Sequence, residues 1–201
     1  MPSSRSDLQI FPRQAGYPDT NSVSSSDGTT GLLQAAAADS VSAGLASLPQ
    51  DLRGQNSRHV VMLRGLRRVF LLDNGELRNA FPVAIGMPGW ETPTGRFEVL
   101  QKIPNPVWVH PVSGERVEEQ GPENPLGSHW IAFHRDCLGR DAHDGEAWIT
   151  IKGCTTTGFH GTPHRWTVGR AVSHGCVRLY NEDVSALYRQ VSLGTQVTVL
   201  T

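Results

Sequence analysis

Beyond its N-terminal segment the chain alternates short apolar runs with turn residues, a pattern typical of β-strands. Residues 59–86, HVVMLRGLRRVFLLDNGELRNAFPVAIG, predict three consecutive strands. Arg64-Gly65 predicts the turn between the first two, and Asp73-Asn74-Gly75 is a strong hairpin signal for the next two. Residues 95–100 and 148–151 predict two further strands. This part of the chain is therefore expected to be mainly β.

One helix is expected near the C-terminus. Asn181 is a favourable N-cap residue, and Glu182 and Asp183 would complement the positive end of the helix dipole. The apolar residues that follow fall on one helical face: Val184, Leu187, Tyr188 and Val191. Gly194 is expected to end the helix, and residues 195–200 to form a closing strand. The sum is a mostly antiparallel β domain with one C-terminal helix.

The N-terminal residues 1–55 are expected to form a disordered or linker tail ahead of a folded domain at residues 56–201. Residues 1–30 are rich in Ser, Asp, Pro and Gly and show no apolar period, so they bury too little surface to offset their ordering entropy. Residues 31–49 are rich in Ala and Leu, which fits a short helix, a linker or the core of an export signal. We favour a linker or frayed helix, and we expect no integral membrane segment, because no run reaches the length of a membrane-spanning helix.

The composition agrees with one modest domain and excludes some partners. The chain has 201 residues, of which 38% are hydrophobic, enough for one core. Its formal net charge of −1 gives no basic footprint for nucleic acid. Three cysteines are too few for a disulfide scaffold, so the cysteines invite a chemical interpretation.

The segment of residues 160–179, HGTPHRWTVGRAVSHGCVRL, is typical of a cysteine nucleophile. Cys176 lies in a polar run directly after a glycine, whereas buried structural cysteines usually have apolar neighbours. A nucleophilic thiol needs a base, small neighbouring residues and backbone N–H donors for an oxyanion. The pair His160-Gly161, sixteen residues upstream, and the flanking glycine meet these needs within one segment.

Four segments in order resemble the L,D-transpeptidase catalytic domain, also called the YkuD domain. They are TPTGRFEVL (residues 92–100), GPENPLG (121–127), HGT…GRAVSHGCVRLYNED (160–183) and LYRQVSLGTQVTVL (187–200). The resemblance extends from about residue 59 to residue 201. It implies a mainly β, β-sandwich-like fold with one C-terminal helix.

The resemblance implies that Cys176 is the nucleophile and that His160 is its base. Gly161 matches a position whose backbone helps to orient that histidine. His174 is a competing base, because residues two apart in a strand-like run share a face; it is otherwise expected to contact substrate. Other histidines are read as ordinary surface or structural residues.

Three further residues near the cysteine are expected to support the reaction. Gly175 and Cys176 are the expected sources of backbone N–H groups for the oxyanion. Ser173 is expected to shape the turn by a local hydrogen bond. Arg178 either binds a substrate carboxylate, which suits its fork of donors, or forms a structural salt bridge.

The implied reaction is an acyl transfer on peptidoglycan stem peptides. A thioester forms at Cys176 with release of D-alanine, and the acyl group passes to a diaminopimelate amine, which cross-links the cell wall. Transfer to water would make the same site an L,D-carboxypeptidase, and transfer to a protein lysine would anchor a lipoprotein. The resemblance also implies acylation by carbapenems and an extracytoplasmic location in the periplasm or cell wall. No metal and no cofactor are expected. A non-catalytic wall-binding module is the alternative of another class.

Cys137 and Cys154 allow two interpretations. With Cys176 and nearby histidines they suggest zinc, but the spacing fits no compact template, and His134 with Cys137 is the only close pair. Alternatively, in an oxidising compartment they pair as a disulfide and leave Cys176 free. Cys137 lies within a polar insertion, residues 133–148, and Cys154 follows it; this insertion is a candidate lid or substrate wall.

Overall fold

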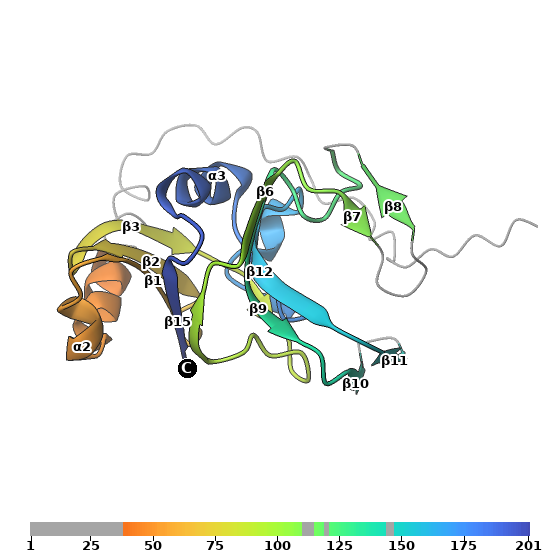
Figure 1. Cartoon of the computed structure of the whole chain (residues 1–201), viewed down its shortest axis with the longest axis horizontal. Coiled ribbons are helices and arrows are strands. Elements are labelled where there is room, and N and C mark those ends of the chain that lie inside the picture. The colour runs from red at the N-terminus through yellow and green to blue at the C-terminus, as the bar shows by residue number, and fades with distance from the viewer. Residues whose placement is uncertain (1–37, 110–114, 119–120, 144–146) are drawn as a thin grey trace, which may run out of the picture. The chain divides into compact units, whose positions relative to one another are not determined.

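Two β-sheets form the framework of the domain (Figure 1). The structure is a computed structural model that describes residues 38–109, 115–118, 121–143 and 147–201. The larger sheet has five strands in the order β3 (Glu76–Pro82), β2 (Arg68–Asp73), β1 (Arg58–Leu63), β15 (Gln196–Leu200) and β5 (Gly95–Glu98). Within it, β1 and β15 run parallel, and the other neighbours are antiparallel. The strands predicted from residues 59–86 and the closing strand are therefore confirmed.

The smaller sheet carries the site described below. Its four strands are ordered β14 (Val177–Arg178), β12 (Thr155–His160), β9 (His129–Asp136) and β6 (Gln101–Pro104), with β12 and β14 parallel. Three two-stranded ribbons complete the described strands: β4 (Ile85–Gly86) with β13 (Ala171–Ser173), β7 (Trp108–Val109) with β8 (Arg116–Val117), and β10 (Arg140–His143) with β11 (Trp148–Ile151). The strand predicted at residues 148–151 is β11.

The two turns predicted among the first strands are both present, with one difference. In the hairpin between β2 and β3, Asn74 has φ 53° and Gly75 has φ 79°, the left-handed conformation that a tight hairpin turn requires. The turn between β1 and β2 covers residues 64–67, and its left-handed residue is Arg67, with φ 49°, not Gly65. The backbone strain of that turn therefore falls on a residue whose side chain disfavours it.

The main core lies between the two sheets and α3 (Asn181–Gln190). Alternate residues of β1 and β2 point into it: Val60, Met62, Val69 and Leu71. The smaller sheet contributes Ile131, Phe159 and Val177, and α3 contributes Val184 and Leu187. This arrangement matches the sandwich-like β fold with a C-terminal helix that the sequence predicts.

The N-terminal helices cover the opposite face of the larger sheet. Residues 38–47 are helical, and α2 (Gln50–Arg53) follows them. Leu48 and Leu52, each 1% exposed, pack in a second core with the other alternate residues of β1 and β2. Figure 1 shows β1 to β3 between α2 and α3. The sequence predicts a tail over residues 1–55, but residues 39–55 belong to the same compact unit as the strands.

The ends of α3 differ from the expectation. Tyr180 is the N-cap residue and makes no side-chain cap, and Asn181 is the first helical residue. The Asn181 side chain instead accepts a hydrogen bond from the Ser128 N–H at 3.0 Å. The helix ends at Gln190, so Gly194 lies in the following turn, with φ 78°. The predicted cap at Asn181 and stop at Gly194 are therefore wrong. The asparagine does not cap the helix because its side chain binds the backbone of a distant loop. Among the described residues no helix has the length and apolarity needed to cross a membrane.

Candidate active site

Strand pairing brings the predicted site residues to one face of the smaller sheet. In the parallel pair β12–β14, Phe159 is opposite Val177, and His160 is opposite Arg178. Phe159 and Val177 are buried in the main core. Because successive side chains of a strand point to opposite faces, His160 and Arg178 lie on the outer face. Cys176 directly precedes Val177 and is placed on that outer face by the same alternation.

Cys176 is a partly buried free thiol that contacts β12. Its Sγ donates to the carbonyl oxygen of Thr156 at 3.9 Å, and the Gly158 N–H donates to the sulfur. Burial raises the pKa of the Cys176 thiol, and the Gly158 N–H and the Arg178 guanidinium act in the opposite direction. The resting sulfur is therefore protonated at neutral pH, with two groups already placed to stabilise a thiolate.

A tight turn precedes the nucleophile. The Ser173 hydroxyl donates to the Cys176 carbonyl oxygen at 2.5 Å and accepts from the Gly175 N–H at 3.2 Å. Gly175 has φ 110°, a conformation that strains any residue with a Cβ. Its N–H is thus engaged by Ser173 in this structure, and its role at the oxyanion stays a prediction. Among the described residues the Cys176 N–H has no acceptor, so it is the available donor.

A threonine of the TPTG segment stabilises that turn by hydrogen bonds to the backbone. Thr92 is fully buried, and its hydroxyl donates to the Gly175 carbonyl oxygen at 2.9 Å. The same hydroxyl accepts the Gly86 N–H at 3.0 Å. A residue more than eighty positions away in sequence therefore fixes the backbone next to Cys176.

His160 is 3% exposed and is surrounded by backbone carbonyl groups. Its Nδ1 lies 2.6 Å from the Gly161 carbonyl oxygen. Burial lowers the pKa of His160 to about 3, and the Arg178 guanidinium acts in the same direction. The carbonyl groups of Gly161, Leu126 and Pro125 raise that pKa, but burial prevails. The imidazole is therefore neutral at rest.

The Gly161 carbonyl decides which tautomer this neutral ring adopts. A carbonyl oxygen only accepts hydrogen bonds, so Nδ1 carries the proton and Nε2 keeps its lone pair. With the proton on Nδ1, Nε2 is the ring nitrogen that can act as a base.

The NPLG segment and α3 hold the histidine loop by close backbone packing. A Cβ on Gly161 or on Gly127 would collide with the Asn181 side-chain oxygen. Gly127 also has φ 61°, and its Cβ would meet the backbone of Gly161 and Thr162. These two glycines let the loop carrying Leu126 approach His160. The hydrogen bond from Ser128 to Asn181 closes the same contact.

Arg178 has a fixed backbone and an unpaired side chain. Its N–H donates to the Ala84 carbonyl oxygen at 3.0 Å, and its carbonyl oxygen accepts the Ala84 N–H at 2.9 Å. Its Nε is buried without a hydrogen-bond partner. No ion pair among the described residues includes it. Burial lowers the pKa of Arg178, and the Cys176 thiol raises it.

His174 lies in an exposed position beside the turn. Its ring is edge-on to Trp90, with centroids 4.8 Å apart and planes at 85°. The Trp90 indole donates to the His143 carbonyl oxygen at 2.9 Å, and the Arg140 guanidinium lies 5.6 Å from its ring. Trp90 therefore connects the β10–β11 hairpin to the segment that carries the nucleophile.

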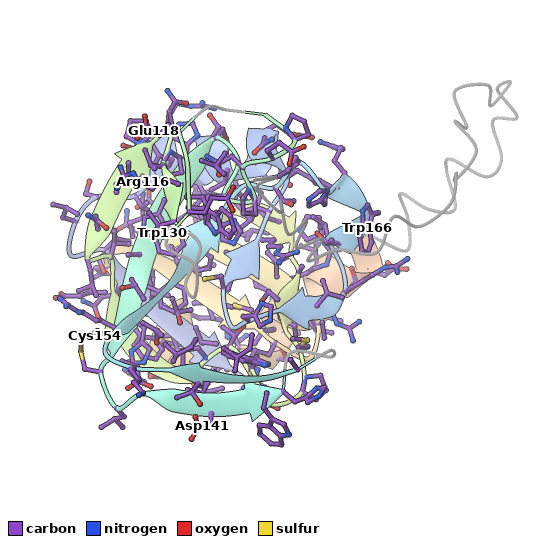
Figure 2. All side chains as sticks on the ribbon, turned by 90° about the vertical axis from the view of Figure 1, so that its right-hand side faces the viewer. Arg116, Glu118, Trp130, Asp141, Cys154 and Trp166 are labelled. Carbon is purple, nitrogen blue, oxygen red and sulfur yellow. A yellow bond between two sulfur atoms is a disulfide. The ribbon has the colours of Figure 1, made fainter. Side chains whose placement is uncertain are left out.

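A disulfide between Cys137 and Cys154 closes the base of that hairpin, which confirms the pairing hypothesis. In Figure 2, Cys154 lies at the base of the β10–β11 hairpin and Asp141 lies on the hairpin itself. Since both sulfurs are bonded to each other, neither is available as a zinc thiolate. Within the described residues no cluster of three metal-binding side chains occurs.

Figure 2 looks onto the outer face of the smaller sheet. Trp130, which is opposite His160 in the β9–β12 pair, lies on this face, and its ring centroid is 5.9 Å from that of His160. Arg116 and Glu118 of the β8 region lie on one side of it and Asp141 on the other, with Trp166 at a third edge. Trp166 is 64% exposed. Aromatic and charged groups therefore surround this face.

Gly158 is a site residue that none of the sequence motifs includes. The β9–β12 register shifts between Thr157 and Gly158, which marks a β-bulge beside Cys176. A Cβ on Gly158 would lie 2.6 Å from the Ile131 carbonyl oxygen and 3.0 Å from the Trp130 ring. An isolated glycine within a predicted strand was the available signal.

The β12–β14 pairing thus places a free cysteine, a neutral histidine and an arginine on one face of a two-sheet β domain. Comparison with known proteins gives the family. The sequence matches the model of the L,D-transpeptidase catalytic domain family, YkuD, over residues 57–199. The chain therefore belongs to this family.

Individual relatives of the chain carry the name of the same family. The putative L,D-transpeptidase YqjB of Bacillus subtilis (strain 168) is 33% identical over 129 residues, 64% of this chain and 62% of the relative. The putative L,D-transpeptidase YkuD of the same strain is 26% identical over 141 residues, 70% of this chain and 65% of the relative. The chain thus spans a little under two thirds of the length of these curated relatives.

Solved structures share the fold. An L,D-transpeptidase from Mycobacterium tuberculosis H37Rv matches with a TM-score of 0.52 at 19% identity, over 72% of this chain and 58% of that one. L,D-transpeptidase 3 from Mycobacterium tuberculosis, in complex with a faropenem-derived adduct, matches with a TM-score of 0.51 at 17% identity, over 72% and 60%. These matches confirm the predicted fold class.

Proposed function

We propose that this domain is a cysteine acyltransferase that acts on peptidoglycan stem peptides as an L,D-transpeptidase. The observation that supports this best is the placement of Cys176, His160 and Arg178 on one face of the smaller sheet by the β12–β14 register. Family membership supports the same reaction.

The first half-reaction begins with a neutral Cys176 thiol and a neutral His160 imidazole. Nε2 of His160 takes the thiol proton while Sγ of Cys176 attacks the carbonyl carbon between the L centre of diaminopimelate and the terminal D-alanine. The Gly158 N–H and the Arg178 guanidinium stabilise the developing thiolate. The Cys176 N–H donates to the oxyanion. The carbon–nitrogen bond then breaks, His160 returns the proton to the leaving amine, and a thioester and D-alanine result.

The second half-reaction reverses these roles. The side-chain amine of a second diaminopimelate attacks the thioester and gives its proton to His160, and the sulfur leaves and is reprotonated. Water in place of this amine gives a carboxypeptidase, and a protein lysine gives a lipoprotein anchor. The acceptor we propose is the diaminopimelate amine.

We propose an extracytoplasmic site of action, in the periplasm or cell wall. The Cys137–Cys154 disulfide supports this, because such bonds persist in oxidising compartments. The faropenem-derived adduct of a relative with the same fold supports acylation of Cys176 by β-lactam inhibitors, the wider class to which the expected carbapenems belong.

The test is intact mass of the protein after mixing with disaccharide-tetrapeptide. Wild type should gain an acyl group lacking D-alanine, and Cys176→Ala should gain nothing. Muropeptide products in the same tube distinguish cross-linking from hydrolysis. Absence of both the adduct and D-alanine release from folded protein would reject the proposal.

A further inference from the structure

The charge on Arg178 has no counter-ion in the described part of the chain. No carboxylate of the described residues forms an ion pair with Arg178, and among these residues it is the Cys176 sulfur that raises its pKa. Its buried Nε has no acceptor. A desolvated guanidinium without a partner costs free energy, because it has lost water without gaining another interaction.

A structural salt bridge is therefore excluded as the role of this side chain in the described structure. The position of Arg178 is already fixed by the paired backbone hydrogen bonds to Ala84 and by the β12–β14 pairing. Neither contact needs the guanidinium. The backbone thus holds the side chain in place, its Nε has no hydrogen-bond partner, and its guanidinium lies near enough to Cys176 to lower the pKa of the thiol.

We infer that the Arg178 guanidinium binds the free C-terminal carboxylate of the donor stem peptide, so that the site selects donors by their chain end. This inference rests on the proposed function. Arg is suited to the role because its planar fork donates two parallel hydrogen bonds to one carboxylate.

The spacing along the strand agrees with this assignment. Cys176 and Arg178 are two residues apart and share a face, so their backbones are about 6.6 Å apart. In the donor, the scissile carbonyl carbon and the terminal carboxylate carbon are separated by only one amino-acid residue. An extended arginine side chain beside the attacking sulfur therefore reaches the carboxylate of the leaving residue.

The same geometry gives a reason for release of a single D-amino acid. A peptide with one more residue would carry its carboxylate beyond this guanidinium and would leave Arg178 unpaired at the equivalent scissile bond. The selectivity comes from an interaction that only the correct chain end completes.

The experiment compares two donors that differ in one group: disaccharide-tetrapeptide with a free C-terminal carboxylate, and the same molecule with a C-terminal carboxamide. Thioester formation is followed by intact mass, and kcat/KM is measured from release of the terminal residue. The variants are Arg178→Gln, Arg178→Lys and the matched surface control Arg189→Gln, which changes an exposed arginine of α3. Thermal melting checks that each variant folds.

Wild type should prefer the carboxylate donor by about 10- to 100-fold, the range expected for charge-assisted hydrogen bonds. Arg178→Gln should bring that preference close to one, Arg178→Lys should retain part of it, and Arg189→Gln should match wild type. The ratio cancels any effect of Arg178 on the thiolate, because that effect is common to both donors.

Two results would overturn the inference: equal use of both donors by wild type, or an unchanged preference in Arg178→Gln. The wild-type comparison needs no folded variant. If neither donor acylates wild type although iodoacetamide alkylates Cys176 normally, the proposed function fails, and the inference fails with it.

Discussion

Replacement of His160 by asparagine should flatten the acid side of the stability profile. The folded domain holds the pKa of His160 at about 3, against 6.5 in a solvated chain. Between these values the unfolded chain binds a proton at residue 160 that the folded chain excludes. The free energy of unfolding should therefore fall by about 1.4 kcal/mol for each pH unit of acidification.

The total effect follows from the same difference. The stability contributed by a neutral His160 is fully present above pH 6.5 and is lost as the pH falls towards 3. The gap corresponds to about 5 kcal/mol in all, and to about 2 kcal/mol between pH 6.5 and 4.5. The total is a large share of the 5–15 kcal/mol that typically stabilises a domain. About half of the loss falls between pH 6.5 and 4.5, where it should be measurable.

Asparagine is the chosen replacement because its amide can still donate to the Gly161 carbonyl but does not titrate in this range. Guanidinium unfolding, followed by tryptophan fluorescence, gives the free energy at each pH from 4.5 to 8. Burial also lowers the pKa values of His59, His129 and His164. These three histidines are present both in wild type and in His160→Asn. The difference between the two stability profiles therefore gives the contribution of His160 alone.

Above pH 7.5 the two profiles should run parallel, which is the internal control. Below pH 6.5 the wild-type profile should fall more steeply. Parallel profiles down to pH 4.5, or an NMR titration of His160 near pH 6.5, would refute the reasoning that burial outweighs the surrounding carbonyl groups.

Three further variants test other contacts. Gly158→Ala should lower acylation of Cys176 at least about tenfold and destabilise the domain by about 1–3 kcal/mol, since its Cβ would lie 2.6 Å from a carbonyl oxygen; intact mass and melting measure these effects. The double change Cys137→Ser and Cys154→Ser should cost about 3 kcal/mol by the chain-entropy argument for a separation of 17 residues, measured by denaturant unfolding. Leu52→Ala should cost about 2–5 kcal/mol in the same assay, because this leucine is 1% exposed against the larger sheet.

The glycine and leucine variants have matched controls. Gly121→Ala, where a Cβ meets nothing within 4 Å, should leave acylation unchanged, and an equal loss in both glycine variants would argue against the bulge. Leu193→Ala, at a leucine 67% exposed, should change stability by less than about 0.5 kcal/mol. Wild-type stability in Leu52→Ala would mean that α2 does not pack on the sheet. Serine variants as stable as wild type, with free-thiol counts confirming loss of the bond, would contradict the disulfide prediction.

The sequence by itself determined the features that depend on near neighbours. Alternation and turn residues predicted the strands of residues 59–86 and the left-handed hairpin at Asn74-Gly75, because strand and turn preferences act over a few residues. The motif around Cys176 gave the family, and the count of three cysteines suggested the pairing of Cys137 with Cys154.

Only the tertiary structure decided which of these groups meet. The parallel pairing of β12 with β14 places Arg178 opposite His160, and a bulge turns the Gly158 N–H towards Cys176. The cap predicted at Asn181 failed because its side chain accepts a hydrogen bond from a loop 53 residues away. Register, burial and unpaired charge arise from contacts between segments distant in the chain, and local sequence preferences carry no information about them.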